Sequence, residues 1–481
     1  MAGERIPRAL IEAYFREHEE EFKRDLAELV AIPSVRSEAL EGKPYGAEPA
    51  RALEAALAIA RRYGLTAENW ENYLGIVEIG PTAEIAEDSR HRPRAVDILA
   101  HLDVVPADPA GWTAGEPFRL TEREGRLYGR GTTDDKGPLL AVLYALRALR
   151  DLQVPLDGRL RLVMGCDEEN GSSDLIYYYQ ETESAAVTLT PDAGWPVINA
   201  EKGILVGTLT GEVAKEHLRG ISEPEAAAIP GDIPGSSRAS TGLRLLSVRG
   251  GTAYNAVPAS CVARLADPKT GTVTEYQTTG RPAHASMPEK GENAVTLMIQ
   301  ALAEREDLDP AERQLFANLR ALFPHGDYRG ERLGVACRDE QTGALTLSLD
   351  VLHYEEGKLR CEFDARLPVG FGEKEIACLE RQFTEAGFQF THLEALPHYV
   401  PEDASFIREL LASYELYTGE KGYCYGIGGL TYCHHVENGV AFGIEQPGSD
   451  HHIHGNDEYA ETGELRQTFL IYAEALARLA G

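Results

Sequence analysis

The sequence predicts an α/β fold, a doubly wound domain into which a separate α+β domain is inserted. Three observations support this prediction. The 481 residues exceed what one hydrophobic core ordinarily holds, so at least two domains are expected. In the first two hundred residues, short apolar runs alternate with segments of helical periodicity. Motifs that combine histidines with acids follow those apolar runs, are not evident in the middle of the chain, and return in the last eighty residues.

The first part of the chain contains strand, helix and strand signals in succession. Short apolar runs of strand length are followed directly by polar residues. The long stretch between two of these runs has the periodicity of a helix that is apolar on most faces. In doubly wound sheets, functional sites lie outside the carboxyl ends of the strands. The expected elements are helices at 8–31, Pro49–Tyr63 and Pro138–Leu152, and strands at Ala95–Ala100 and Arg159–Met164.

The character of the chain changes after Lys202-Gly203. Residues 211–240 are rich in Gly, Pro, Ser and Glu and predict irregular surface structure. Because metal-type residues return only near the end, we expect domain boundaries of 1–203, 204–395 and 396–481, with the middle domain inserted into the outer one. The middle part has strand-like runs at Leu243–Val248, Ala259–Leu265, Leu345–Val351 and Lys358–Arg366, and helical runs at Ala294–Glu306 and Glu373–Ala386.

Composition excludes several classes of partner. A formal net charge of −30 disfavours nucleic acid and anionic membrane surfaces, since both would repel the chain. The start of the sequence has no apolar signal region, and no run of about 20 apolar residues could span a bilayer. The seven cysteines are scattered without a C-x-x-C pair, so neither a disulfide framework nor a thiolate zinc site is indicated. A cytoplasmic protein is expected.

Histidine and carboxylate groups follow the predicted strands. On a strand, positions i and i+2 point to the same side, so in His101-x-Asp103 the acid can hydrogen-bond the imidazole or the ligand beside it. The competing interpretation is a surface histidine followed by a loop aspartate. Asp134-Asp135 precedes the apolar helix and is surrounded by glycines, so one of its carboxylates could bridge two cations. The alternative is that these acids only cap the start of the helix.

Two further acidic positions extend this set. In Asp167-Glu168-Glu169, one carboxylate can bind metal while its neighbour acts as general base, or all three can form a solvated acidic loop. Asp192 follows another apolar run and would be disregarded alone. Of His451, His452 and His454, at most one or two are expected to be ligands. Imidazoles and carboxylates are ligands for divalent metals such as zinc, so the joint order predicts a two-metal hydrolytic centre.

The ordered motifs resemble those of the co-catalytic zinc peptidases and amidohydrolases. This superfamily includes carnosinases, acetylornithine deacetylase, succinyl-diaminopimelate desuccinylase and glutamate carboxypeptidase. The resemblance is strongest to the PepV-type and Sapep-type bacterial dipeptidases. It rests on His101-x-Asp103-Val-Val-Pro106, Gly129-Arg-Gly-Thr-Thr-Asp134-Asp135-Lys-Gly, Glu168-Glu169, Thr190-Pro-Asp192-Ala, Gly250-Gly-Thr-Ala-Tyr-Asn255, Gly280-x-x-Ala-His284, Gly428-Gly-Leu-Thr-Tyr432 and His454-x-x-Asp457-Glu458.

The resemblance implies a role for each of these positions. His101 and Asp192 would hold one ion, Glu169 and His454 the other, and Asp134 would bridge them. The middle domain would be a lid. Asp103 would orient His101, and Glu168 would be the general base. His284 would contact the scissile carbonyl, while Asn255 and Arg366 would bind the substrate, Arg366 through the substrate carboxylate. Gly428 and Gly429 would supply backbone N–H groups to the substrate.

The activity that the resemblance implies is hydrolysis of unblocked dipeptides, including those that contain β-alanine or a C-terminal histidine, with two divalent ions. Zinc is expected first, with manganese or cobalt as alternatives. The alternatives are an amidohydrolase that removes N-acyl groups and a non-catalytic binding protein of the same fold. A monomer is expected. The sequence assigns no role to His434, His435, His451 or His452, or to the segment 212–240.

Overall fold

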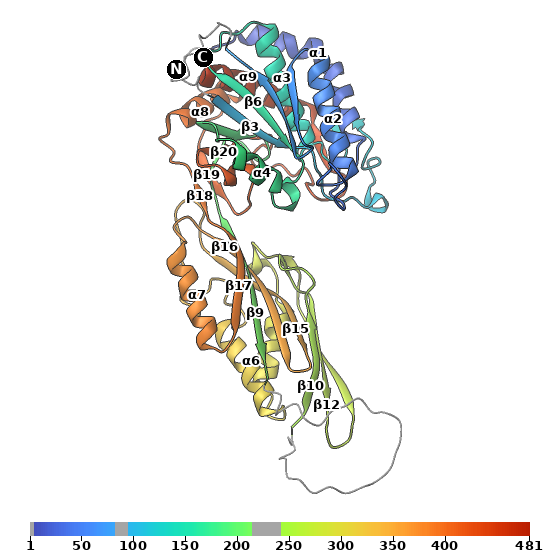
Figure 1. Ribbon diagram of the computed structural model, residues 1–481, viewed down its shortest axis with the longest axis vertical. Coiled ribbons are helices and arrows are strands. Elements are labelled where there is room, and N and C mark those ends of the chain that lie inside the picture. The colour runs from blue at the N-terminus through green and yellow to red at the C-terminus, as the bar shows by residue number, and fades with distance from the viewer. Residues whose placement is uncertain (1–3, 82–94, 214–241) are drawn as a thin grey trace. The chain divides into compact units, whose positions relative to one another are not determined.

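The computed structural model describes residues 4–81, 95–213 and 242–481. It consists of two units, one formed by Met1–Ala200 with His398–Gly481 and the other by Glu201–Pro397 (Figure 1). The second unit is therefore inserted in sequence between the two parts of the first. Most of the segment 211–240, for which irregular surface structure was expected, lies outside the described residues.

The first unit is built on a mixed sheet with a parallel centre. Neighbouring β6, β3, β7 and β20 run parallel. Strand β2 pairs antiparallel with β1 and β6, β8 pairs antiparallel with β20, and β19 (Cys424–Ile427) also pairs with β8. The strand order is β1 (Thr66–Trp70), β2 (Leu74–Ile79), β6 (Arg159–Gly165), β3 (Ala95–His101), β7 (Val187–Thr190), β20 (Gly439–Ala441), β8 (Val197–Glu201) and β18 (His398–Tyr399).

Helices cover both faces of this sheet. Side chains alternate along a strand, so on β3 Ile98 and Ala100 join the large core while Leu99 packs into a smaller cluster on the opposite face. This two-sided burial explains why the central strands are continuous apolar runs. The helices of the unit are α1 (Arg8–Val30), α2 (Ala47–Arg62), α3 (Lys136–Asp151), α4 (Ser173–Glu181), α8 (Ser405–Thr418) and α9 (Thr462–Ala480).

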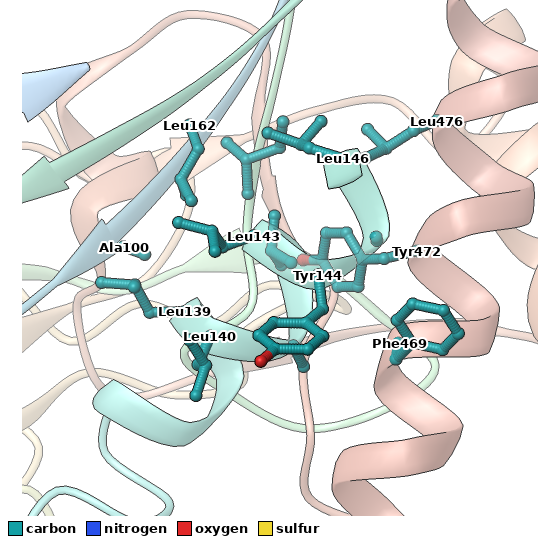
Figure 2. Close-up of a cluster of buried hydrophobic side chains, with 14 of the residues drawn as sticks. Ala100, Leu139, Leu140, Leu143, Tyr144, Leu146, Leu162, Phe469, Tyr472 and Leu476 are labelled. Atoms are coloured by element: carbon teal, nitrogen blue, oxygen red, sulfur yellow. The ribbon is translucent and has the colours of Figure 1, made fainter. Parts of the chain in front are cut away.

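Helix α3 lies in the centre of the large core. Its leucines contact Ala100 of β3 and Leu162 of β6 on one side and aromatic residues of α9 on the other (Figure 2). Full burial of a leucine side chain contributes about 1.5–3 kcal/mol, so the leucines of α3 together fix this helix firmly under the sheet. The residues that precede α3, Asp134 and Asp135, are thereby held at the carboxyl ends of the strands.

A small antiparallel sheet brings the end of the chain to the same edge. Strand β21 (Tyr459–Glu461) pairs with β5 (Arg126–Tyr128), which in turn pairs with β4 (Thr121–Arg123). Because β21 lies only five residues after His454, this pairing carries the C-terminal histidine into the neighbourhood of the loop before α3.

The second unit is an α+β structure with its own core. Its antiparallel sheet is packed against α5 (Ala294–Glu304), α6 (Pro310–Leu322) and α7 (Glu373–Glu385), so the predicted fold class is confirmed. A short pair, β11 (Ala256–Val257) with β14 (Ala283–His284), lies apart from it. The strand order is β13 (Val273–Thr279), β12 (Ser260–Ala266), β10 (Arg244–Gly250), β15 (Thr346–Glu355), β16 (Lys358–Leu367), β9 (Gly203–Glu212) and β17 (Gln389–Ala395).

In the described parts of the chain, no helix combines the length and the apolar character needed to cross a membrane.

Candidate metal centre

Five metal-type side chains converge at the carboxyl edge of three adjacent parallel strands. His101 is the last residue of β3, Glu169 lies in the turn η2 (Glu168–Asn170) after β6, and Asp192 follows β7. Asp134 comes from the loop before α3, and His454 from the loop before β21. The strand order β6, β3, β7 therefore explains why residues so far apart in sequence meet.

The five side chains form two groups that share Asp134. In the first, His101 Nε2 lies 3.0 Å from Asp134 Oδ1 and 3.5 Å from Asp192 Oδ2. In the second, His454 Nε2 lies 2.8 Å from Asp134 Oδ2 and 3.1 Å from Glu169 Oε2. Within each group the potential ligand atoms all lie within 4.8 Å of one another. Asp134 thus offers one oxygen to each group, which is the geometry of a bridging carboxylate.

The electrostatics of the cluster favour bound cations. Burial and the charge of Asp134 raise the pKa of both Asp192 and Glu169. Hydrogen bonds that the His454 imidazole donates to Asp134 and Glu169 raise its pKa to about 11, and three carboxylates raise the pKa of His101 despite its burial. Without metal, protons on the imidazoles offset the crowded carboxylates. Bound divalent cations would compensate the negative charge of these carboxylates more fully than the protons do.

His101 is oriented to present Nε2 to the cluster. Its ring is fully buried, and Nδ1 lies 3.0 Å from the backbone oxygen of Asp103, which suits an Nδ1–H donor, so that a metal displacing the proton on Nε2 would meet the Nε2 lone pair. The His101 backbone N–H donates to Asp135 Oδ2 at 3.1 Å, so Asp135 anchors the strand end instead of capping α3. The donor set and this tautomer both fit a divalent metal such as zinc.

Asp103 acts mainly on the turn that carries the two glutamates. Its Oδ1 accepts the backbone N–H of Glu168 and its Oδ2 that of Glu169, each at 3.1 Å. The carboxylate also lies 3.5 Å from His101 Nδ1, a longer contact than the backbone one. The expected partnership with His101 therefore exists chiefly through the Asp103 main chain, while the side chain positions Glu168 and Glu169.

Glu168 differs from its neighbour in its surroundings. Among the residues that the structure describes, it belongs to neither ligand group. Its side chain is partly exposed and lines the same cavity as Asp134, Glu169 and Asp192. Desolvation and the surrounding carboxylates Asp192, Glu169 and Asp134 raise its pKa, with His101 acting in the opposite direction. A carboxylate beside a metal pair with a raised pKa is suited to accept and return a proton.

Two buried acids that support the site were not assigned roles from the sequence. Glu458 Oε1 accepts backbone N–H groups of the loop 131–134 while Oε2 accepts from Arg130, so this residue shapes the loop that presents Asp134. Asp174 accepts the N–H groups of Cys166 and Asp167 just before η2. The chain contains 77 acidic residues, and the sequence alone does not show that these two are buried.

The remaining histidines of the C-terminal cluster lie outside the two ligand groups. His451 is buried, and its Nε2 lies 2.6 Å from Glu464 Oε2. His452 is exposed and has a left-handed backbone with φ of 56°. His434 and His435 lie in the turn η5 (Tyr432–His435), where His434 stands beside the ring of His398. Of the three clustered histidines, only His454 joins a candidate metal group among the described residues.

A cavity of about 590 Å³ opens onto both ligand groups. Its lining includes Asp134, Glu168, Glu169, Asp192 and His454. Gly429 lines the cavity and Gly428 belongs to the same loop, between β19 and η5, while the supply of their N–H groups to a substrate stays a prediction. The other lining residues are Ala193, Gly194, Trp195, Ile198, Tyr423, Tyr425, Ile427, Leu430, Thr431, Glu445, Gln446, Pro447, Gly448, Ser449 and Ile453.

The predicted lid residues lie together within the second unit. The Asn255 carbonyl accepts the N–H of Ala285, next to His284, whose Nδ1 lies 2.7 Å from Ser286 Oγ. Burial and the nearby charge of Arg366 lower the pKa of His284, which therefore favours a neutral imidazole. Arg366 donates from Nε and Nη2 to Asp364 at 2.9 and 3.0 Å, so that edge of its guanidinium is already engaged.

Comparison with known proteins identifies relatives along nearly the whole chain. Residues 98–478 match peptidase family M20/M25/M40. The chain is 32% identical to the putative dipeptidase YtjP of Bacillus subtilis, covering 96% of this chain and 97% of that protein. It is 31% identical to the Beta-Ala-Xaa dipeptidase of Lactobacillus delbrueckii subsp. lactis, covering 95% of each. The structure of human carnosine dipeptidase 1 has the same fold, with a TM-score of 0.57 at 16% identity over 98% of each chain.

Proposed function

Because the chain belongs to peptidase family M20/M25/M40 and is thus a peptide-bond hydrolase, we propose that it is a metal-dependent dipeptidase that cleaves unblocked dipeptides. The observation that carries the proposal is the pair of ligand groups that share Asp134 beside a cavity of about 590 Å³. The names of its relatives, putative dipeptidase and Beta-Ala-Xaa dipeptidase, support the same substrate class.

Two divalent ions are proposed as cofactors. His101 and Asp192 would hold one, Glu169 and His454 the other, and Asp134 would bridge them. When bound, such ions lower the pKa of water and polarise a carbonyl oxygen. A set of two imidazoles and three carboxylates suits zinc, and it also suits manganese and cobalt.

Glu168 is proposed as the general base and acid. Its carboxylate would accept a proton from the attacking water as the new carbon–oxygen bond forms. It would then return that proton to the amine nitrogen as the peptide bond breaks. Asp103 would hold Glu168 in place through the two backbone hydrogen bonds to the turn η2. This account requires Glu168 to remain off the metals, and its exclusion from both groups in the described residues supports that role.

His284 is proposed to stabilise the oxyanion from the inserted unit, with Asn255 and Arg366 helping to hold the substrate. A neutral imidazole at His284 can donate one N–H to a developing negative charge. His284→Ala is expected to lower kcat by about 10²–10³-fold, the usual effect of losing one such donor, with metal content unchanged. Steady-state kinetics on a dipeptide and metal analysis of the same sample check this, and an unchanged kcat would remove His284 from the chemistry.

The experiment that tests the proposed function compares free and N-acetylated dipeptides as substrates. The metal-loaded protein is expected to hydrolyse free dipeptides, including β-Ala-His, at least about 100-fold more efficiently than their N-acetyl forms, because an unsatisfied polar group in a fitted site is costly. Release of both amino acids is measured by chromatography. Preference for the acetylated compounds would instead identify an N-acyl amidohydrolase, and absence of hydrolysis of either would favour a binding protein.

The setting of the enzyme is proposed from the same sequence features. A cytoplasmic monomer acting on free short peptides, without nucleic acid or membrane partners, agrees with the net charge of −30 and the seven scattered cysteines, all of which are free thiols in the structure.

A further inference from the structure

Glu445 lies on the cavity wall and is fixed to the segment that carries a candidate ligand. Its backbone N–H donates to the carbonyl of Ala193 at 3.1 Å, and its carbonyl accepts the N–H of Trp195 at 2.8 Å. These two bonds hold Glu445 against the residues immediately after Asp192. Its side chain is 29% exposed and lines the cavity together with the two ligand groups. The carboxylate is therefore both held in place and accessible from the cavity.

A buried imidazole stands behind this carboxylate. His451 is 2% exposed, with Nε2 2.6 Å from Glu464 Oε2 and Nδ1 3.5 Å from Glu445 Oε2, and its ring packs on Tyr459. Burial alone would lower the pKa of His451, but the two carboxylates raise it to about 9. Glu464 makes the closer contact with His451, so the Glu445 carboxylate keeps only the longer contact of 3.5 Å with this imidazole and remains available to the cavity.

Outside the candidate ligand groups, no side chain that lines the cavity in the described structure carries a positive charge that could pair with Glu445. In the described structure, the lining contains no lysine or arginine, and the histidine that it contains, His454, belongs to a ligand group. The cavity lining also includes Tyr423 and Tyr425, whose rings lie 5.8 Å apart, and the charge of Glu445 acts on Tyr425. A partly exposed carboxylate beside aromatic rings, in a cavity without Lys or Arg, is complementary to a small cation.

We infer that Glu445 binds the ammonium group at the free amino end of the substrate and so selects unblocked peptides. This inference rests on the proposed dipeptidase function and identifies the residue that makes the enzyme distinguish a free amine from an acylated one. A dipeptide carries its ammonium a few bonds from the scissile carbonyl, and Glu445 is tied by its backbone to the segment that follows Asp192. An N-acyl group would bring an uncharged, bulkier amide against the same carboxylate and leave that carboxylate without a partner.

The test compares the wild type with Glu445→Gln and with a control, Glu437→Gln, which changes an exposed glutamate of the same unit. The substrate is Ala-Leu, and propionyl-Leu, which has the same shape without the ammonium, serves as competitive inhibitor. Glu445→Gln is expected to raise KM for Ala-Leu by about 10–100-fold, as for loss of a hydrogen bond between charged groups. The inhibition constant of propionyl-Leu should stay within about twofold, with the metal content unchanged. Glu445→Asp, which keeps the charge, should give an intermediate KM.

Each outcome separates the inference from the proposal on which it rests. If KM for Ala-Leu stays unchanged in Glu445→Gln, or if KM and the inhibition constant of propionyl-Leu rise together, the role of Glu445 is overturned while the dipeptidase proposal stands. If the wild type does not cleave Ala-Leu, or cleaves acetyl-Leu in its place, the dipeptidase proposal fails and the assignment of Glu445 fails with it.

Discussion

Glu168→Gln is expected to lower kcat for a dipeptide by about 10³–10⁴-fold, at the upper end of what a positioned general base contributes. Glutamine has almost the same shape as glutamate but cannot accept the proton of the attacking water. The backbone hydrogen bonds from the Glu168 and Glu169 N–H groups to Asp103 do not involve the altered side chain, so η2 should keep its conformation. Both metal ions should remain bound, because Glu168 lies outside the two ligand groups in the described structure.

The measurement is single-turnover and steady-state kinetics together with metal analysis of the same preparation. Glu402→Gln, a change at an exposed position of the same unit, is the matched control and should behave like the wild type. Full activity in Glu168→Gln would contradict the assigned role. Loss of an ion together with activity would show that Glu168 is a metal ligand and not the base.

Asp134→Asn is expected to lower activity about as strongly as Glu168→Gln, but through loss of metal binding. The two oxygens of Asp134 face different groups, Oδ1 toward His101 and Oδ2 toward His454. Asparagine keeps one carbonyl oxygen and places an amide donor where the second oxygen was, so it can serve at most one cation. We expect at least one ion to be lost and kcat/KM to fall on the order of 10³-fold or more, since the chemistry needs both ions.

Metal content by mass spectrometry and kcat/KM on a dipeptide check this prediction. Asp403→Asn, an exposed change in the same unit, is the control for a general effect of replacing an acid. Two ions retained at wild-type affinity in Asp134→Asn would contradict the bridging role of this carboxylate.

Much of the fold could be predicted because local sequence patterns reflect burial. The apolar run at Ala95–Ala100 corresponds to β3, and the stretch Pro138–Leu152 corresponds to α3. Helix α9 received no prediction, since it is buried on nearly all sides and its 3.6-residue periodicity is correspondingly blurred. Helix α4 has nine residues, too few for a clear period. Strand β9 pairs with β16 and β17, more than 140 residues later, and nothing in its local sequence specifies those partners.

The candidate site was predictable to the extent that its residues follow strands. His101 ends β3, and Glu169 and Asp192 follow β6 and β7 within a few residues, so the parallel arrangement brings them together. His454 could be chosen from three clustered histidines only by resemblance. Glu458 and Glu445 could not be found, because their roles depend on contacts with residues 131–134 and with Ala193, which are remote in sequence.

The most direct test of the account is a metal titration of the apoprotein followed by hydrolysis of a free dipeptide. Zn²⁺, Mn²⁺ or Co²⁺ is added in increments to chelator-treated protein, and the release of both amino acids is measured at each step. The account predicts no hydrolysis without metal and activity that rises to a plateau at two equivalents. Full activity in the metal-free protein, or a plateau at one equivalent, would contradict a two-metal dipeptidase.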